Sequence, residues 1–203
     1  MGSIYDLKPR FQDLLRPLML SLREAGATPN QLTLAALALS IATGLLVWAA
    51  LSMPILLLLV PLALFLRMAL NALDGMMARE CHLESPLGRI LNELGDVVSD
   101  TAIFLPFALH CDNGWPVVLF AILAILSEFT GLLGASVSGE RVYDGPMGKS
   151  DRAFAIGLFA LLLFHWPGLA CAGGLYFHAL SALTLWSIRN RIVHMLDRVQ
   201  GGL

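Results

Sequence analysis

Six long apolar stretches dominate this chain of 203 residues, of which 57% are hydrophobic and only 14% are charged. The stretches cover about residues 30–51, 54–79, 86–110, 115–138, 151–170 and 173–195. As an α-helix, each is long enough to cross the roughly 30 Å of hydrocarbon in a bilayer. Because backbone polar groups in lipid must be satisfied within the segment, the sequence predicts an all-α membrane protein with six transmembrane helices. We expect a single domain over residues 1–203, with the lipid bilayer as a partner and no nucleic acid.

Residues 4–25 differ from these stretches because they mix charged and apolar side chains. The apolar ones recur at helical spacing near one face: Ile4, Leu7, Phe11, Leu14, Leu15 and Leu18. This pattern predicts an amphipathic helix lying in the membrane interface, with a bend at Pro17. The first membrane helix then begins with a capping box, in which Thr28 is the N-cap and Gln31 its partner.

Lysine and arginine residues are unevenly distributed along the chain. All except Arg67 lie near the two termini or in the loops around residues 79–89 and 139–152, and the three loops on the opposite side contain none. Because positively charged loops stay in the cytoplasm, we expect both termini and these two loops to face the cytoplasm.

The three cysteines show no zinc-type spacing. Cys81 is expected near the cytoplasmic face as a free thiol. Cys111 and Cys171 are expected near the opposite face, where a disulfide between them is one possibility.

Polar residues gather in the second and third apolar stretches, between residues 71 and 100. They are Asn71, Asp74, Asn92, Glu93, Asp96 and Asp100. An acidic group at membrane depth is costly unless it is paired, hydrated or bound to a cation, so such groups are candidates for function. Helical geometry puts Asn71 and Asp74 on one arc of their helix, and Glu93, Asp96 and Asp100 on one face of the next. Facing each other, the two helices could hold a magnesium ion.

The spacing of this cluster resembles the signature of CDP-alcohol phosphotransferases, Asp-x2-Asp-Gly-x2-Ala-Arg-x8-Gly-x3-Asp-x3-Asp. Six positions match over 26 residues: Asp74, Gly75, Ala78, Arg79, Gly88 and Asp96. Asn71 and Asn92 stand where the signature has its first and third aspartates. TPNQLT at residues 28–33 and the basic segment at residues 148–152 also resemble stretches of this family.

The resemblance implies a bacterial enzyme of the inner membrane that works in phospholipid biosynthesis. It would transfer a phosphatidyl group from a CDP-linked lipid, most simply CDP-diacylglycerol, to a small alcohol and release CMP. It implies Mg²⁺ or Mn²⁺ as cofactor: two ions held by Asp74, Asp96 and the positions of Asn71 and Asn92. Asp96 would be the catalytic base that takes the proton of the acceptor hydroxyl.

The resemblance also assigns residues to the two substrates. Those implied in nucleotide binding are Asp74, Gly75, Ala78, Arg79 and Gly88, and those implied in acceptor binding are Arg141, Lys149 and Arg152. Relatives are commonly dimers, so a homodimer is a further expectation.

The two asparagines leave three interpretations open, because an amide offers a metal its oxygen but no charge. Glu93 or Asp100 could replace the lost carboxylates. One ion could instead bind tightly while a second arrives with the substrate, or the chain could be an inactive relative. Two broader alternatives also remain: a choline- or ethanolamine-phosphotransferase, suggested by SPLG at residues 85–88, and a cation-binding or scaffold membrane protein.

Arg67 matches no position of the signature and lies deep in the second stretch. Since the second and third stretches run in opposite directions with a rise of about 1.5 Å per residue, Asp100 comes level with Arg67. We therefore predict a buried Arg67–Asp100 ion pair, with Glu128 of the fourth stretch as the alternative partner. This pairing competes with a role for Asp100 as a metal ligand.

Overall fold

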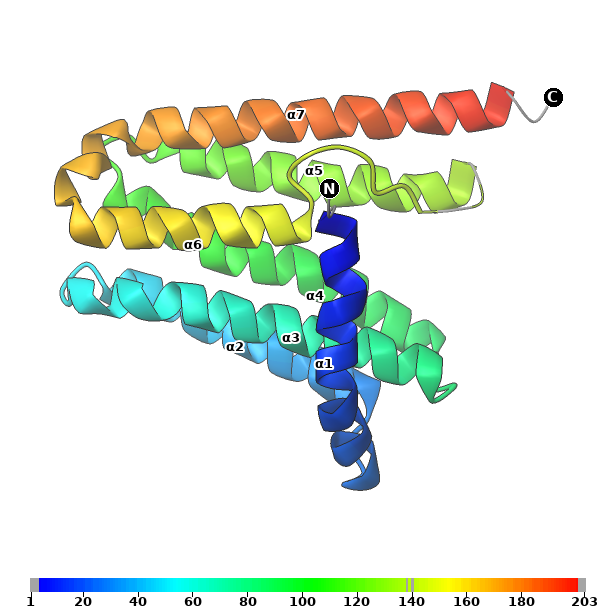
Figure 1. Cartoon of the computed structure of the whole chain (residues 1–203). Helices are drawn as coiled ribbons and strands as arrows, with labels where there is room; N and C mark the ends of the chain where they lie inside the picture. The colour runs from blue at the N-terminus through cyan, green and yellow to red at the C-terminus, as the bar shows by residue number, and fades with distance from the viewer. Residues whose placement is uncertain (1–3, 138, 140, 201–203) are drawn as a thin grey trace.

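The computed structural model describes residues 4–137, 139 and 141–200, and within them the side chains of residues 10–137, 139 and 141–199. These residues form helices, turns and loops and contain no strand. In chain order the elements are α1 Ile4–Glu24, α2 Pro29–Ala49, the 3₁₀ helix η1 Pro54–Leu59, α3 Val60–Glu80, α4 Pro86–Phe104, η2 Leu105–His110, α5 Trp115–Val137, α6 Lys149–His165, η3 Pro167–Leu169 and α7 Ala170–Gln200 (Figure 1). The predicted all-α class is confirmed for the described residues.

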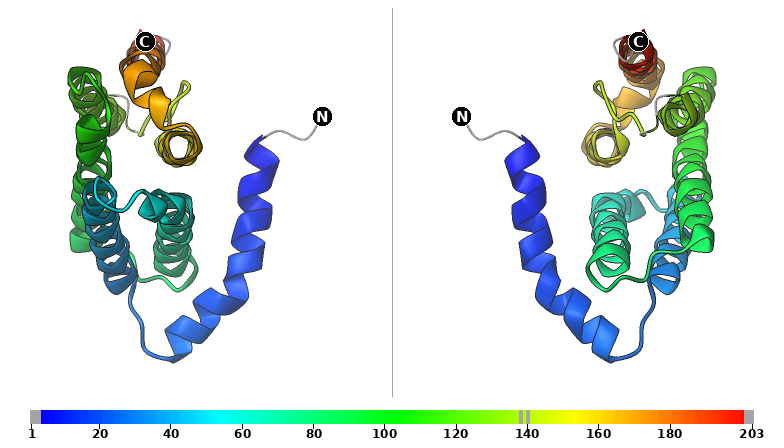
Figure 2. Two further views of the ribbon diagram at one scale, coloured as in Figure 1. Left: turned by 90° about the vertical axis from the view of Figure 1, so that its left-hand side faces the viewer. Right: turned by 90° about the vertical axis from the view of Figure 1, so that its right-hand side faces the viewer.

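Helices α2 to α7 run side by side as one bundle, whereas α1 crosses their direction (Figure 1). Within the bundle α2 packs on α3 and α4, α3 on α6, α4 on α5, and α5 on α7. Helix α1 packs on α3 and bends along its length (Figure 2), as Pro17 inside a helix leads one to expect.

Four helical stretches of the described chain are long and apolar enough to cross a membrane: 29–49, 54–80, 115–137 and 167–199. Helices α4 and α6 fall short of that measure for a physical reason. Helix α4 carries the acidic residues of the predicted site, and α6 has only 17 residues and begins with three charged residues among its first four. Both nevertheless lie alongside the other bundle helices (Figure 1).

The starts of the helices follow from local sequence. The hydroxyl of Thr28 accepts from the backbone of Gln31, whose side chain accepts from the Thr28 N–H, so the predicted capping box is confirmed. Ser85 accepts from the backbone N–H of Gly88 at 3.0 Å and begins α4. These caps fix where the helices that carry the signature enter the bundle.

The end of the fifth apolar stretch was predicted too far along the chain. Helix α6 ends at His165 rather than at residue 170, and α7 already begins at Ala170. Pro167 explains the break, because it cannot donate a helical hydrogen bond and disfavours helical geometry at the residue before it.

Buried phenylalanines form much of the apolar core. Phe159 makes edge contacts with Phe107 and Phe177, at ring-centre separations of 5.6 and 5.0 Å. Helix α2 approaches α4 closely at Gly44, where a Cβ atom would lie 2.2 Å from the carbonyl oxygen of Ala102. This contact sets the distance between the helices beneath the polar cluster.

All three cysteines are free thiols, so no disulfide joins Cys111 and Cys171. Cys111 is buried, whereas Cys171 is exposed and donates to the carbonyl oxygen of Gly168 at 2.9 Å.

On the N-terminal helix, Leu14 and Leu18 are exposed while Met19 is buried against the bundle. Ile4 and Leu7, which belong to the predicted apolar face, have side chains outside the described part of the chain.

Candidate active site

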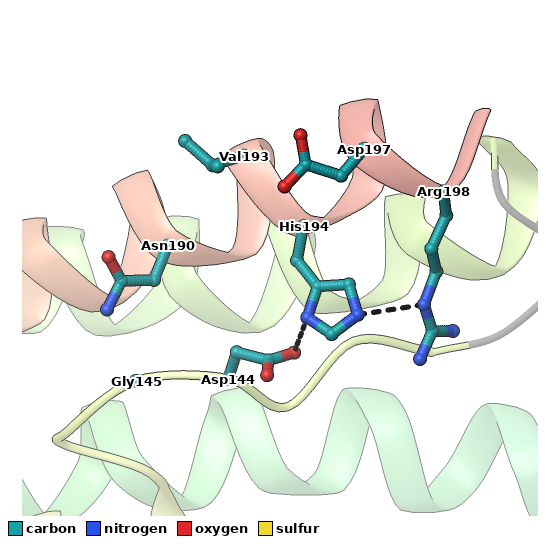
Figure 3. A pocket seen from close by; sticks show the side chains of 7 residues that line it. All are labelled: Asp144, Gly145, Asn190, Val193, His194, Asp197 and Arg198. Atoms are coloured by element: carbon teal, nitrogen blue, oxygen red, sulfur yellow. Dashed lines mark hydrogen bonds and ion pairs between the residues drawn. The ribbon is translucent and has the colours of Figure 1, made fainter. Parts of the chain in front are cut away.

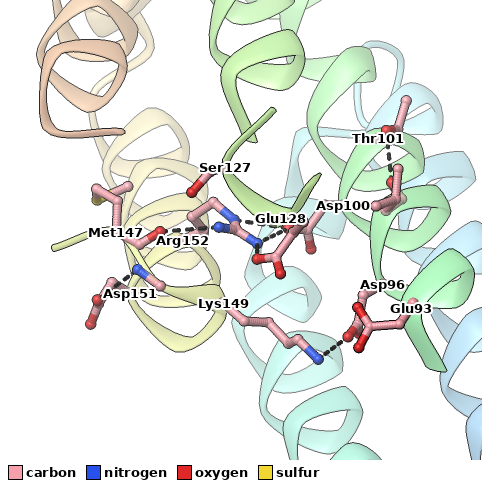
Figure 4. Close-up of polar contacts among 12 residues, drawn as sticks. Glu93, Asp96, Asp100, Thr101, Ser127, Glu128, Met147, Lys149, Asp151 and Arg152 are labelled. Atoms are coloured by element: carbon pink, nitrogen blue, oxygen red, sulfur yellow. Dashed lines mark hydrogen bonds and ion pairs between the residues drawn. The ribbon is translucent and has the colours of Figure 1, made fainter. Parts of the chain in front are cut away.

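Charged side chains from α4, α5 and α6 meet inside the bundle (Figure 4), and Arg67 of α3 pairs with one of them. The sequence explains why they share one level: Asp96 and Asp100 are one turn apart on α4, Glu128 lies in the second half of α5, and α6 begins with Lys149. All three carboxylates are at least nine-tenths buried. Their partners therefore decide what each can do.

Asp100 lies between two guanidinium groups. Arg67 Nη1 is 2.8 Å from its Oδ1 atom, so the ion pair predicted from helix register is confirmed. Arg152 Nε donates to the other oxygen at 2.9 Å. Both oxygens of Asp100 thus face arginine, which favours the pairing role over metal ligation.

Glu128 joins two arginines from different segments. It accepts from Arg152 at 2.6 Å and from Arg141, in the loop before α6, at 2.6 Å. Arg152 is fully buried and also donates to the carbonyl oxygen of Met147 at 3.0 Å. The predicted contact between Arg152 and the acceptor is therefore not supported, because its guanidinium is already shared among three protein groups.

Glu93 forms an ion pair with the same Arg141. This pair ties the loop between α5 and α6 to α4. It also occupies the carboxylate that was expected to replace a missing metal ligand, so Glu93 holds a loop in place in this structure.

The two aspartates of the signature differ in their partners. Asp74 is 5% exposed and accepts from the hydroxyl of Thr33 at 2.7 Å, and it makes no ion pair with any residue that the structure describes. Asp96 contacts the ammonium group of Lys149 with one oxygen (Figure 4), while its other oxygen lies 3.4 Å from the amide nitrogen of Asn71 and 3.8 Å from Nη2 of Arg67. Asp74 is thus a buried carboxylate in need of a cation.

The small residues of the signature lie where other groups come close. A Cβ atom on Gly75 would be 3.2 Å from Nη1 of Arg79, so this arginine folds back over the glycine. A Cβ atom on Gly88 would be 2.8 Å from Oδ1 of Asn30, at the start of α2. The TPNQLT segment therefore completes the site by packing on the signature itself.

A cavity of about 200 Å³ opens beside these groups. Its lining residues are Asn92, Asp96, Glu128, Arg141, Tyr143, Gly148, Lys149 and Arg191. It thus brings together Asp96, the predicted base, and two of the three residues predicted to bind the acceptor.

A larger open hollow of about 590 Å³ lies along the last turns of α7 (Figure 3). There His194 links Asp144, at 2.9 Å, to Arg198, which donates to its other nitrogen at 2.9 Å. None of its lining residues belongs to the signature. We therefore assign the site to the smaller cavity, which contains Asp96.

The donor set fits one hard divalent ion. Asp74 and Asp96 offer carboxylate oxygens, Asn71 and Asn92 offer amide oxygens, and Mg²⁺ commonly takes one or two carboxylates together with water and substrate phosphates. In the described part of the chain no three His, Cys, Asp or Glu side chains are arranged to hold a metal. Because the set has two carboxylates rather than four, it suits a single ion better than the two that the signature implied.

This fold and these residues agree with one known protein family. The sequence profile of the CDP-alcohol phosphatidyltransferases matches residues 27–188, and the chain belongs to that family.

Relatives and solved structures agree with this assignment. The inner membrane protein YnbA of Escherichia coli (strain K12) is 50% identical over 190 residues, which cover 93% of this chain and 94% of that protein. Phosphatidylinositol phosphate synthase (PgsA1) of Mycobacterium tuberculosis, in complex with manganese and citrate, superposes with a TM-score of 0.72 at 19% identity, over 89% of this chain and 88% of that one. The same protein with CDP-DAG bound gives 0.70 at 18% identity, over 88% and 92%. These structures show a shared fold.

Sequence reasoning missed two residues of the site. Thr33 donates to Asp74, although its only signal was its place in the family-like segment at residues 28–33. Arg191 of α7 lines the cavity and donates to the carbonyl oxygen of Ser127. Nothing in its local sequence distinguishes it from the other arginines near the C-terminus.

Proposed function

We propose that this chain transfers a phosphatidyl group from a CDP-linked lipid, most simply CDP-diacylglycerol, to an alcohol and releases CMP. The observation that carries the proposal is that Asp96 of α4 lines a cavity and accepts from Asn71, which lies one turn before Asp74 on α3, within the fold of this family. A solved structure with CDP-DAG bound shares that fold, which supports a CDP-linked lipid as donor.

The chain's own groups suit the chemistry of phosphoryl transfer, which depends on holding the reacting oxygens in line and neutralising charge. Asp74 and Asp96, with the amides of Asn71 and Asn92, would hold the divalent ion, which neutralises the donor's phosphates when bound. Arg79, folded over Gly75, is placed to contact the nucleotide. Backbone exposed at Gly75, Ala78 and Gly88 gives the nucleotide room to approach.

The acceptor would bind in the cavity beside Asp96. Arg141 and Lys149 line it and would orient an anionic or hydroxylated head group, while Arg191 adds a third cation at its wall. Asp96, also in the lining, would take the proton from the acceptor hydroxyl. Arg152 would act indirectly, by holding the side chains of Asp100 and Glu128 in position.

The direct test is a lipid analysis with purified protein. The protein is incubated with CDP-diacylglycerol, Mg²⁺ or Mn²⁺ and a panel of alcohols that includes phosphorylated polyols, and CMP and new phospholipid are measured. The proposal predicts CMP release that depends on both metal and acceptor. A CDP-choline-type donor is included. Activity with that donor alone would show that it, and not CDP-diacylglycerol, is the donor. Folded protein that releases CMP from neither donor with any acceptor would overturn it.

We also propose six membrane crossings in the bacterial inner membrane, with both termini and the site in the cytoplasm and α1 in the interface. Four helical stretches meet the length and apolarity needed, and α4 and α6 lie alongside them with Asp96, Asp100 and Arg152 buried. Helix α1 crosses the bundle direction and exposes Leu14 and Leu18, as an interfacial helix would.

The cysteines provide a test of this orientation. Burial raises the pKa of the Cys111 thiol to about 11, so it is expected to be unreactive at neutral pH. Cys171 is exposed at the start of α7 and Cys81 follows the end of α3, and these two helix ends lie at opposite ends of the bundle (Figure 1). In intact cells whose outer membrane has been permeabilised, a membrane-impermeant maleimide is expected to label Cys171, and Cys81 only after lysis. Labelling of Cys81 before lysis would show that the orientation in the membrane is the opposite of the one proposed.

A further inference from the structure

The position of Lys149 is not explained by the stability of its helix. It is the first residue of α6, where the positive end of the helix dipole disfavours a cation. The same turn contains the expected acidic residue, since Asp151 accepts from the backbone N–H of Gly148 at 3.0 Å. The ammonium group of Lys149 reaches across to Asp96 on α4 instead (Figure 4). Its contact is therefore with the candidate metal site.

The two carboxylates of the site already balance one divalent ion, and the lysine adds a further positive charge. Asp74 and Asp96 are the two carboxylates, and Asn71 and Asn92 are neutral. Lys149 already supplies one positive charge at Asp96, while Asp74 has no ion-pair partner among the described residues. A second divalent ion would add two positive charges next to the lysine in a largely buried place, where uncompensated charge is costly.

Neighbouring acids do not supply the missing negative charge. Glu93 is paired with Arg141, and Asp100 lies between Arg67 and Arg152. Recruiting Glu93 would leave Arg141 with Glu128 alone, and recruiting Asp100 would take from buried Arg67 its 2.8 Å contact. The charge available to metal ions is therefore that of two carboxylates.

We propose that this site takes one hard divalent cation, held by Asp74 and the remaining oxygen of Asp96, and that the ammonium group of Lys149 takes the place of a second metal ion. The inference rests on the proposed function, which makes the site a metal site. In the alternative interpretation, a second ion arrives with the substrate. In this proposal the ammonium group of Lys149 still occupies the position of the second ion when the nucleotide is bound.

The first experiment counts metal ions. Full-length protein purified in detergent is titrated with Mn²⁺, with and without CMP, and bound manganese is measured by equilibrium dialysis and electron paramagnetic resonance. The expected result is one Mn²⁺ per chain in both conditions, with the spectrum of an isolated ion. Two ions per chain, or a spin-coupled pair in the presence of CMP, would overturn the inference.

The second experiment removes the lysine. Lys149→Gln is expected to tighten binding of the single Mn²⁺ by roughly tenfold, because a nearby positive charge is lost. Arg189→Gln, on the exposed face of α7, makes the same charge change and is the matched control, with no change in affinity expected. An unchanged affinity in Lys149→Gln would show that the ammonium group does not act at the metal site.

The third experiment rebuilds a two-ion site. Asn71→Asp and Asn92→Asp combined with Lys149→Gln are expected to bind two Mn²⁺ as a spin-coupled pair, whereas the two aspartate changes with Lys149 intact bind only one tightly. Two ions in the variant that keeps Lys149 would contradict the proposal.

The same protein samples separate this inference from the proposed function. If wild type binds two Mn²⁺ and releases CMP from CDP-diacylglycerol, the function stands and the single-ion inference fails. If wild type binds one Mn²⁺ but transfers nothing to any acceptor, the inference about the ion stands and the proposed function fails.

Discussion

At one end of the bundle, phenylalanines from η2, α5, α6 and α7 pack ring against ring, whereas nearer the other end α4, α5 and α6 bury carboxylates and guanidinium groups. Each aromatic contact is weak and nearly independent of the next. Each charged group, in contrast, depends on a partner, since an unpaired buried charge is costly. The aromatic end therefore holds the helices together, and the charged end determines which groups are free to react.

Within the charged end, the partners divide the acids into two kinds. Asp100 and Glu128 each contact two guanidinium groups and serve as structure. Asp74 contacts a hydroxyl, and Asp96 contacts a partly exposed lysine and has Arg67 only at 3.8 Å, so these two are the acids that we propose for the metal ion and the proton. The following changes test this division.

The largest effect is expected at Asp96. Asp96→Asn keeps the side-chain volume but removes the base and a metal ligand, so CMP release is expected to fall by about 10²- to 10⁴-fold. The unfolding temperature is expected to stay unchanged. Asp112→Asn, an exposed change at the opposite end, is the control that keeps full activity. Retained activity in Asp96→Asn would assign the base elsewhere.

Asp100→Ala is expected to act on stability. It leaves Arg67 buried without its carboxylate and is expected to cost about 3–5 kcal/mol. Arg67→Met with Asp100→Leu is expected to recover part of this loss, because Arg152 keeps Glu128 as a partner. The free energy of unfolding is measured in detergent for the wild type, the single variant and the double variant. If the double change is as unstable as the single one, the pair is not what Asp100 contributes.

Phe159→Ala is expected to lower stability by about 3 kcal/mol through the cavity it leaves among the aromatic rings. The matched control on the same helix is Phe154→Ala, whose side chain is 73% exposed. Mn²⁺ affinity is expected to be unchanged in both, because neither residue belongs to the charged end. A loss of metal binding in Phe159→Ala would show that the two ends are coupled.

The smallest effect is expected on α1. Arg16 pairs with Glu80 at 3.1 Å, but both side chains are more than a third exposed, and water screens such pairs. Arg16→Gln, Glu80→Gln and the double change are expected to show no resolvable coupling in an unfolding cycle. A clear coupling would mean that the membrane surface shields this pair from water.

Sequence reasoning reached as far as local periodicity and helix register allow. Arg67 and Asp100 lie on consecutive antiparallel helices, so the rise per residue was enough to pair them. The contacts of Arg152 with Asp100 and of Lys149 with Asp96 join α6 to α4 across more than fifty residues of chain. Helix register cannot predict these two contacts, because they depend on how α6 packs against α3 and on the path of the loop that contains Arg141.

The acids outside the signature show the same limit. The sequence presented Glu93 and Asp100 as acids near a metal site that could replace the carboxylates lost at Asn71 and Asn92. The structure separates them by their partners, since each contacts a buried or half-buried arginine. Which carboxylates are held in close guanidinium pairs, at 2.8 Å or less, is a property of tertiary packing that the sequence does not show.

The most direct measurement is an anomalous-scattering map from crystals grown with Mn²⁺ and CMP. The account predicts one manganese peak per chain, with side-chain oxygens of Asp74 and Asp96 roughly 2.1–2.5 Å away and the ammonium group of Lys149 still beside Asp96. A peak held by Glu93 or Asp100, or no peak at Asp74 and Asp96 in crystals of the folded protein, would contradict it.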